Sequence, residues 1–573
     1  MFLLNPKQLI ENHPDPKLNE ILRKTVDFFE TKGKKSLKED DLNRVWYTDF
    51  LNFIKREKIF ATLLTPEGYG NEDCRWDTSR LCAFNELLGF YGLCYWYAWQ
   101  VTILGLGPIW MSNNEVLKRK AAQLLDDGAI FAFGLSEKEH GADIYASDML
   151  LMPTGEGKYV ARGDKYYIGN ANEAAMVSTF GRLPDGGDYV FFVVNSKHAK
   201  YELVKNITAT QSYVAEFILH DYPVSDADIL SRGDAAWNAT LNTVNIGKYN
   251  LGWASIGICT HAFYEAINHA SERSLYGMHV TDFSHVKQMF VDAYSRLIAM
   301  KFFATRAADY FRSAAAEDRR YLLYNPVVKM KVTTQGEEVI NLLWDVIAAK
   351  GFEKDTYFDT AARDIRALPK LEGTVHVNIA LIVKFMQNYF FNPADYQAVP
   401  RRDDAKNDDF LFDQGATKGL GKIRFHDYRS VYEGSVLPNV TIFTEQIKAF
   451  REFLLKATPD ANQQKDIDFI LTVGEIFTLI VYGQLILENA VLCDINDDIV
   501  EQIFDFMVRD FSKFALQLYS KTSSTDLQME YCQRMIRKTN VDSQRCQRVL
   551  DNYVYSLKGS YSMTEKELTD ENK

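Results

Sequence analysis

The sequence predicts an α+β protein of several domains, in which helical regions surround one small antiparallel β domain. The chain has 573 residues, enough for about three or four domains of common size. Its apolar fraction is 47%, with 37 Phe and 31 Tyr, which is typical of large packed cores. The hydrophobic period also changes from helical to strand-like near residue 130 and back again near 236.

The first region, 1–129, reads as helical. Residues 17–33 and 40–60 carry apolar side chains at spacings of three and four, and Gly33 predicts the end of the first helix. Residues 87–111 contain no charged side chain and are long enough to cross a membrane. The GLGP stretch at 105–108 predicts a break in that helix, so we expect a buried helix beside an apolar pocket and no integral membrane span.

The second region, 130–235, reads as the β domain. Short runs rich in β-branched and aromatic residues alternate with Gly, Pro, Asp and Asn, which is the pattern of an antiparallel sheet. The runs are AIFAFGLSE (129–137), YVARGDKYYIG (159–169), AAMVSTFGRL (174–183), DYVFFVVNS (188–196) and YVAEFILHDYPV (213–224).

Helical spacing returns over 236–395, and an additional helical region follows over 396–573. The charged, proline-containing stretch 392–409 predicts a boundary or a surface loop between the two. In the last region, the apolar segment 469–492 contains Glu475 and Glu488. We therefore expect a buried helix, with peripheral membrane association left open.

Charge and cysteine content exclude several classes of protein. The net charge of −12 disfavours a nucleic-acid partner, which needs a basic face. The seven cysteines are scattered and include no C-x-x-C pair, so neither a disulfide framework nor a metal site is predicted. The N-terminus is not a signal peptide, and we expect a cytoplasmic protein.

Two stretches of the β domain resemble the flavin-binding middle domain of the acyl-CoA dehydrogenases. In 131–151, Ser136 and Glu137 stand where that family has a Thr-Glu pair, and Gly141 stands near the end of the motif. Residues 163–182 resemble the next family motif, with Tyr167 in place of a tryptophan.

The helical region 236–395 adds further matches, so that the resemblance covers about residues 1–395. The stretch 270–277 resembles the family's Glu-Arg-x-x-Phe-Gly motif. Residues 348–378 contain the rest of the series in order: Gly351, Phe352, Arg363, Asp364, Glu372, Gly373 and Thr374. The chain resembles a diverged, bacterial-type member with an extra C-terminal helical region. The resemblance implies a barrel-like β domain and a four-helix bundle over 236–395.

The resemblance also implies a set of site residues. Glu372 would be the catalytic base, and Lys248 and Gly373 would contact the acyl-CoA. The FAD contacts would be Phe133, Leu135, Ser136, Gly141, Ala142, Tyr167, Ile168, Gly169, Arg273, Ala348, Ala349, Gly351, Thr374 and His376. Gly169 replaces the family threonine that bonds flavin N5, Ala142 replaces a serine, and Ala348 and Ala349 replace paired glycines.

A second Glu-Gly dipeptide, Glu433-Gly434, competes with Glu372-Gly373 for the role of base. Arg363-Asp364 precedes Glu372 at the family spacing, whereas Arg424 before Glu433 is not followed by an aspartate. We therefore interpret Glu433 as a look-alike in the additional region.

The reaction that the resemblance implies is FAD-dependent α,β-dehydrogenation of an acyl-CoA thioester to the trans-2-enoyl-CoA, as in fatty-acid β-oxidation. The implied partner is an electron-transfer flavoprotein, and the implied assembly is a homodimer. Two alternatives stay open: an acyl-CoA oxidase that uses O₂, and a non-catalytic relative that binds acyl-CoA or a protein.

Overall fold

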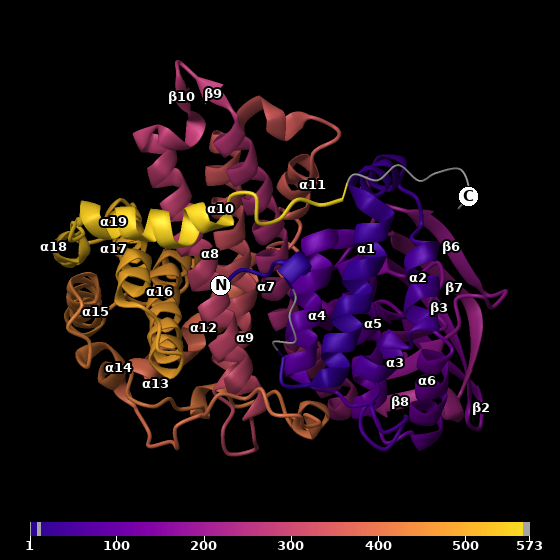
Figure 1. Cartoon of the computed structure of the whole chain (residues 1–573). Helices are drawn as coiled ribbons and strands as arrows, with labels where there is room; N and C mark the ends of the chain where they lie inside the picture. The colour runs from indigo at the N-terminus through magenta and orange to yellow at the C-terminus, as the bar shows by residue number, and fades with distance from the viewer. Residues whose placement is uncertain (1, 9–12, 142, 565–573) are drawn as a thin grey trace. The chain divides into compact units, whose positions relative to one another are not determined.

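The computed structural model describes residues 2–8, 13–141 and 143–564, which form two compact units. One, the sheet unit, comprises Pro6–Asn250 and Asp403–Lys418, with the last described residues, 563 and 564. The other, the helical unit, comprises Leu251–Arg402 and Gly419–Ser562, with residues 2–5. The predicted fold class is confirmed: helices, a central sheet, more helices, and further C-terminal helices follow one another along the chain (Figure 1).

Among the described residues of the sheet unit, six α-helices precede the sheet: α1 (Pro16–Asn43), α2 (Thr48–Arg56), α3 (Ile59–Leu64), α4 (Thr78–Tyr91), α5 (Leu93–Met111) and α6 (Glu115–Asp126). The carboxylate of Asp15 accepts from the backbone N–H groups of Lys17 and Leu18, which caps the start of α1. Gly33 interrupts α1 with φ 76°, as predicted, but the helix resumes directly after it.

The predicted break at 105–108 is wrong, because α5 continues through Pro108 to Met111. The break comes instead at Gly92, between α4 and α5. Pro108 removes one helical hydrogen bond, but α5 continues because it is buried along almost its whole length. The glycines serve close packing: a Cβ on Gly105 would lie 2.7 Å from the backbone of Ala132. The helix break was predicted wrongly because Gly105 serves a contact with a distant strand, which the local sequence does not reveal.

The sheet is mixed and mostly antiparallel. Its strands are β1 (Phe131–Gly134), β2 (Leu150–Gly155), β3 (Lys158–Gly169), β4 (Met176–Arg182), β5 (Tyr189–Val194), β6 (Tyr201–Asn206), β7 (Val214–Ser225) and β8 (Ile229–Arg232). The order is β6-β7-β3-β2-β4-β5-β8, and β1 pairs with β4. The β1–β4 and β2–β4 pairs are parallel. The buried helix α5 packs against β1 and β4.

Helix α7 (Gly233–Glu272) contributes residues to both units. The helical unit continues with a short hairpin and twelve helices among the described residues. They are β9 (Ser274–Leu275), β10 (Met278–His279), α8 (Ser284–Arg312), α9 (Tyr321–Val327), α10 (Thr333–Ile347), α11 (Tyr357–Asp364), α12 (Val375–Ile382), α13 (Met386–Phe391), α14 (Arg429–Glu433), α15 (Pro438–Lys456), α16 (Ile467–Leu492), α17 (Asp497–Tyr519), α18 (Asp526–Met535) and α19 (Ser543–Val549).

Helices α8, α10, α16 and α17 pack together in the helical unit (Figure 1). A π-helical turn, Val328–Val332, joins α9 to α10 without a gap. Helix α16 is the apolar segment of the additional region. Of the described helices, it alone is long and apolar enough to span a membrane by length and composition, and 83% of its most apolar stretch is buried inside the protein.

The charged stretch 392–409 has irregular backbone over most of its length, as predicted. Its end is tied to the start of α4: Asn407 Oδ1 accepts from the Trp76 N–H at 2.7 Å, and Asp408 Oδ2 accepts from the Thr78 N–H at 2.6 Å. None of the seven cysteines forms a disulfide.

Candidate active site

The residues predicted for the site fall into both units, so each half is described by itself. In the sheet unit they lie on β1, on the loop after it, and at the end of β3. In the helical unit they lie at the hairpin β9–β10, at the end of α10 and in the loop before α12.

The loop after β1 is bonded to β3 through Ser136. Ser136 Oγ donates to the Tyr166 carbonyl at 2.6 Å, and the Tyr166 N–H donates to the Ser136 carbonyl at 2.9 Å. The buried ammonium of Lys165 donates to the Leu135 carbonyl at 2.9 Å. These bonds fix the loop after β1 against the end of β3, the strand on which Tyr167 lies.

The end of β3 contains a bulge that exposes one aromatic ring. The β3–β7 register shifts between Lys165 and Ile168, and Tyr167 has φ 64° with a side chain that is 61% exposed. Gly169 is buried, and a Cβ on it would lie 2.6 Å from Val101 and 2.7 Å from Tyr97. A threonine therefore cannot occupy position 169 in this packing, which explains the departure from the family motif.

Glu137, beside Ser136, is a structural carboxylate. Its Oε1 accepts from Lys165 Nζ at 2.6 Å and from Ser147 Oγ at 2.7 Å, and its Oε2 accepts from the Asp148 N–H at 2.6 Å. Burial raises its pKa, but the Lys165 charge and the hydrogen bonds outweigh that effect and hold the pKa of Glu137 below its ordinary value.

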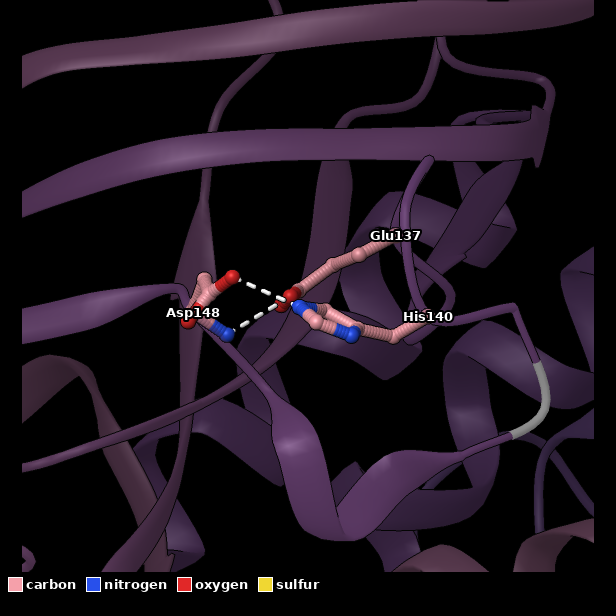
Figure 2. Close-up of side chains that lie close together, drawn as sticks. All are labelled: Glu137, His140 and Asp148. Carbon is pink, nitrogen blue, oxygen red and sulfur yellow. Dashed lines mark hydrogen bonds and ion pairs between the residues drawn. The ribbon is translucent and has the colours of Figure 1, made fainter.

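Figure 2 shows that Glu137 and His140 both point toward Asp148. Their ligand-type atoms lie within 4.8 Å of one another. The hydrogen bond from His140 to Asp148, 2.6 Å long, raises the pKa of the imidazole. The Lys165 ammonium already compensates the Glu137 charge at this point, so the cluster does not favour a cation.

The other predicted residues of the sheet unit differ in exposure. Phe133 and Ile168 are buried in the core, so only their backbone is available to a ligand. Gly141 has φ 53° and open space where a Cβ would lie. Ala142 lies outside the described residues. Lys248 is buried, with 7% of its surface exposed, so it is not a solvated surface lysine.

In the helical unit, Glu372 and Gly373 form an unusual backbone pair. Glu372 has φ 52° and Gly373 has φ 88°. The left-handed conformation is unfavourable for a non-glycine residue and needs support from surrounding structure. Backbone conformations of this kind are concentrated at functional sites.

Two buried side chains supply that support. Lys329, on the π-helical turn, donates to the carbonyls of Pro369 (2.6 Å) and Gly373. Asn378, on α12, donates to the carbonyls of Gly373 (3.2 Å) and Thr374 (2.9 Å). Sequence analysis missed Lys329. The available signal was a lysine within the apolar run that follows Pro326.

The loop after α10 carries three more predicted residues. Ala348 and Ala349 are exposed, and Ala348 has φ 54° and ψ −134°. This conformation favours glycine, the residue that the family has there. Gly351 is buried, and a Cβ on it would lie 2.9 Å from Ile347.

Arg273 precedes the hairpin β9–β10, whose turn residues Tyr276 and Gly277 have φ 52° and 80°. The Arg273 side chain is exposed, and within the described ranges it has no ion-pair partner. Tyr276 is 96% exposed. An exposed cation and an exposed ring on a protruding turn are suited to contact with another molecule.

Thr374 and His376 are exposed near the N-terminus of α12, where Thr374 Oγ1 accepts from the Val377 N–H. Glu433 is the last residue of the five-residue helix α14 and is exposed. Gly434, which follows it, has φ −75°. The structure therefore gives the two Glu-Gly dipeptides different backbones.

Comparison with known proteins finds similarity to one family. Residues 235–387 match the family model described as acyl-CoA dehydrogenase, C-terminal domain. The comparisons support an acyl-CoA dehydrogenase family member, as the sequence motifs predicted. An acyl-CoA dehydrogenase of Bacillus subtilis is 23% identical over 295 residues, which cover 50% of this chain and 76% of that relative. The caffeyl-CoA reductase-Etf complex subunit CarC of Acetobacterium woodii is 21% identical over 53% of this chain and 81% of its own length.

A solved structure is similar over almost the whole chain. It is an acyl-CoA dehydrogenase of Bacillus anthracis complexed with FAD, with a TM-score of 0.75 and 16% identity, and 97% of each chain is covered. The curated relatives above align with about half of this chain. The fold of the additional C-terminal region is thus shared with a member of the family.

Proposed function

We propose that the protein is an FAD-dependent oxidoreductase that removes one hydrogen each from the α and β carbons of an acyl-CoA thioester. Family membership supports the reaction class. The observation that carries the assignment of the base is the left-handed pair Glu372–Gly373, which is held by buried side chains in the loop before α12.

The residues present fit a flat aromatic cofactor with a diphosphate. Tyr167 offers an exposed ring on β3, and Gly141 leaves open space beside its backbone. Ser136 Oγ uses its proton on the Tyr166 carbonyl and keeps acceptor capacity for a donor on a ligand. Arg273 offers an exposed guanidinium, the group best suited to bidentate phosphate contact. When bound, FAD supplies the acceptor for the hydride that leaves the β carbon.

In this proposal, the Glu372 carboxylate takes the α-proton. That proton is weakly acidic, so the developing negative charge on the thioester oxygen needs preorganised donors. The backbone N–H of Glu372 is one such donor in the proposal, which would make the loop conformation part of the chemistry. Gly373, without a Cβ, lets the backbone come close to the acyl-CoA.

The electron acceptor that we propose is an electron-transfer flavoprotein, and the proposed location is the cytoplasm. The proposed electron acceptor is based on the relative CarC, whose name describes it as a subunit of a complex with Etf. We also propose a homodimer in which Arg273 reaches the cofactor of the partner subunit. Its exposed position beside the protruding turn supports this role. A mass measurement in solution tests the assembly: a tetramer would contradict it.

Anaerobic titration of the purified protein with acyl-CoAs of graded chain length tests the reaction. The expected result is bleaching of the flavin absorbance by at least one chain length, with formation of one enoyl-CoA per flavin. A colourless protein that cannot be loaded with FAD would instead support a non-catalytic relative.

Mixing the reduced protein with O₂ in a stopped-flow instrument tests the acceptor. We expect slow reoxidation by O₂ and fast reoxidation by an electron-transfer flavoprotein. Fast reoxidation by O₂ would identify an acyl-CoA oxidase.

A further inference from the structure

Lys329 lies against the loop that carries Glu372. It belongs to the π-helical turn Val328–Val332, and none of its surface is exposed. Its ammonium donates to the carbonyl of Pro369, three residues before Glu372, and to the carbonyl of Gly373, directly after it. One side chain therefore joins the two ends of the segment that contains the proposed base.

The π-helical turn is what directs this lysine at the loop. Two threonines at the start of α10 occupy carbonyls of the widened turn: Thr333 Oγ1 donates to the Lys329 carbonyl at 2.5 Å, and Thr334 Oγ1 donates to the Met330 carbonyl at 2.8 Å. Hydroxyl groups that bond to the carbonyl four residues before them often bend a helix. Single π-helical turns within helices are frequent at functional sites.

A neighbouring lysine shows that the position of Lys329 is specific. Lys331, on the same turn, is also buried, but its ammonium lies 3.9 Å from Asp510 and 5.8 Å from the centre of the Tyr482 ring. It forms an ion pair between the π-helical turn and α17, and it makes no hydrogen bond to residues 369–373 among the contacts that the structure describes. Two lysines two residues apart thus have different partners.

A buried ammonium is costly unless hydrogen bonds compensate it, and a non-glycine residue in the left-handed conformation adds strain. At this loop the cost of burying the ammonium and the strain of the left-handed residue offset one another. The ammonium of Lys329 finds its acceptors when residues 369–373 hold the conformation in which Glu372 has φ 52°. Hydrogen bonds from a charged donor are stronger than those between neutral groups, which favours this strained conformation.

We infer that Lys329 is a positioning residue that fixes the loop 369–373 and, through it, the carboxylate and backbone N–H of Glu372. This inference rests on the proposed function for its effect on catalysis. Its structural part, the fixation of the loop, does not depend on that function.

The test compares Lys329→Met with the matched control Lys331→Met. Both remove a buried ammonium from the same turn, but only the first removes the bonds to the loop. Lys329→Gln, which keeps a polar group, serves as a second variant if Lys329→Met folds poorly.

Hydrogen–deuterium exchange of the amides of residues 370–378 gives the first readout, and it needs neither cofactor nor activity. We expect at least tenfold faster exchange in both Lys329 variants and unchanged exchange in Lys331→Met. Unchanged exchange in the Lys329 variants would overturn the inference, whatever the protein catalyses.

The rate of flavin reduction by a saturating acyl-CoA gives the second readout. Displacement of a reacting group by about 1 Å costs about 10²-fold in rate, so we expect a loss of about that size in Lys329→Met. The acyl-CoA dissociation constant should stay within about twofold of the wild-type value. General destabilisation would not lower the rate while leaving this constant unchanged. A wild-type rate in Lys329→Met would overturn the positioning role. Failure of the wild-type protein to react would instead overturn the proposed function and leave the exchange result valid.

Discussion

Residues 366–378 and 427–439 both contain a Glu-Gly dipeptide, and the structure treats them differently. In the first, both dipeptide residues are left-handed. The Gly373 carbonyl accepts from Lys329, and the carbonyls of Gly373 and Thr374 accept from Asn378. In the second, Glu433 ends a short helix, and Gly434 has φ −75°. The comparison shows that the dipeptide itself is not the signal. A strained backbone that buried donors maintain distinguishes the candidate base from the look-alike.

The same helix supports both regions. A Cβ on Gly474 of α16 would lie 2.2 Å from Ile379 of α12, the helix that follows Glu372. A Cβ on Gly483 of α16 would lie 2.7 Å from the hydroxyl of Tyr432, which precedes Glu433. The additional C-terminal region is therefore packed against α12, the helix that follows the loop of the proposed base, as well as against the residue before Glu433.

The largest difference that we expect between the two regions is catalytic. Loss of a general base costs about 10²–10⁴-fold, so Glu372→Gln should lower the rate of flavin reduction by that amount. Glu433→Gln should stay within about twofold of the wild-type protein. Single-turnover bleaching under anaerobic conditions measures both variants. A normal rate in Glu372→Gln, or a loss of similar size in Glu433→Gln, would break the comparison.

The second prediction concerns protein stability in the region of Glu433, where the buried carboxylate of Glu488 has a structural role. Glu488 accepts from His426 and from Arg306. Burial raises its pKa, but these partners outweigh burial and lower the pKa from 4.5 to about 2. Because the folded value is the lower one, the stabilisation is complete above pH 4.5 and is lost as the pH falls from 4.5 toward 2.

At 1.36 kcal/mol per pKa unit, this shift corresponds to about 3 kcal/mol at neutral pH. Glu488→Gln should therefore lower the free energy of unfolding by about that amount at pH 7, and the difference from wild type should shrink below pH 4.5. Urea denaturation at a series of pH values measures it, with Glu433→Gln as the control. If the difference in the free energy of unfolding did not change with pH, the stabilising role of the Glu488 charge would be contradicted.

The third prediction uses the two glycines of α16. Overpacking a core costs about 1–3 kcal/mol, so Gly474→Ala and Gly483→Ala should each lower the free energy of unfolding by an amount in that range. Only Gly474→Ala should also slow flavin reduction, because Ile379 lies on the helix after the loop. If both variants slowed the reaction equally, α16 would act on the site through general stability alone.

The smallest expected effect compares the two dipeptide glycines. Gly373→Ala places a side chain at φ 88° and should destabilise the protein by about 1 kcal/mol. Gly434→Ala meets no strain at φ −75° and should be neutral or stabilising by about 0.4–1 kcal/mol. Thermal denaturation of the two variants measures the contrast, and effects of the same sign would show that Gly373 tolerates a side chain.

The amino-acid sequence by itself determined the order of helical and β regions, because hydrophobic period and β-branched runs depend on neighbouring residues along the chain. It also pointed to Glu372 rather than Glu433, through the spacing of motifs. The break at 105–108 was predicted wrongly, since the glycines there serve contact with Ala132 from a distant strand. Lys329 was not predicted from the sequence for the same reason. Its acceptors lie 40 and 44 residues further along the chain, and only the tertiary structure brings a buried ammonium to the loop that it holds.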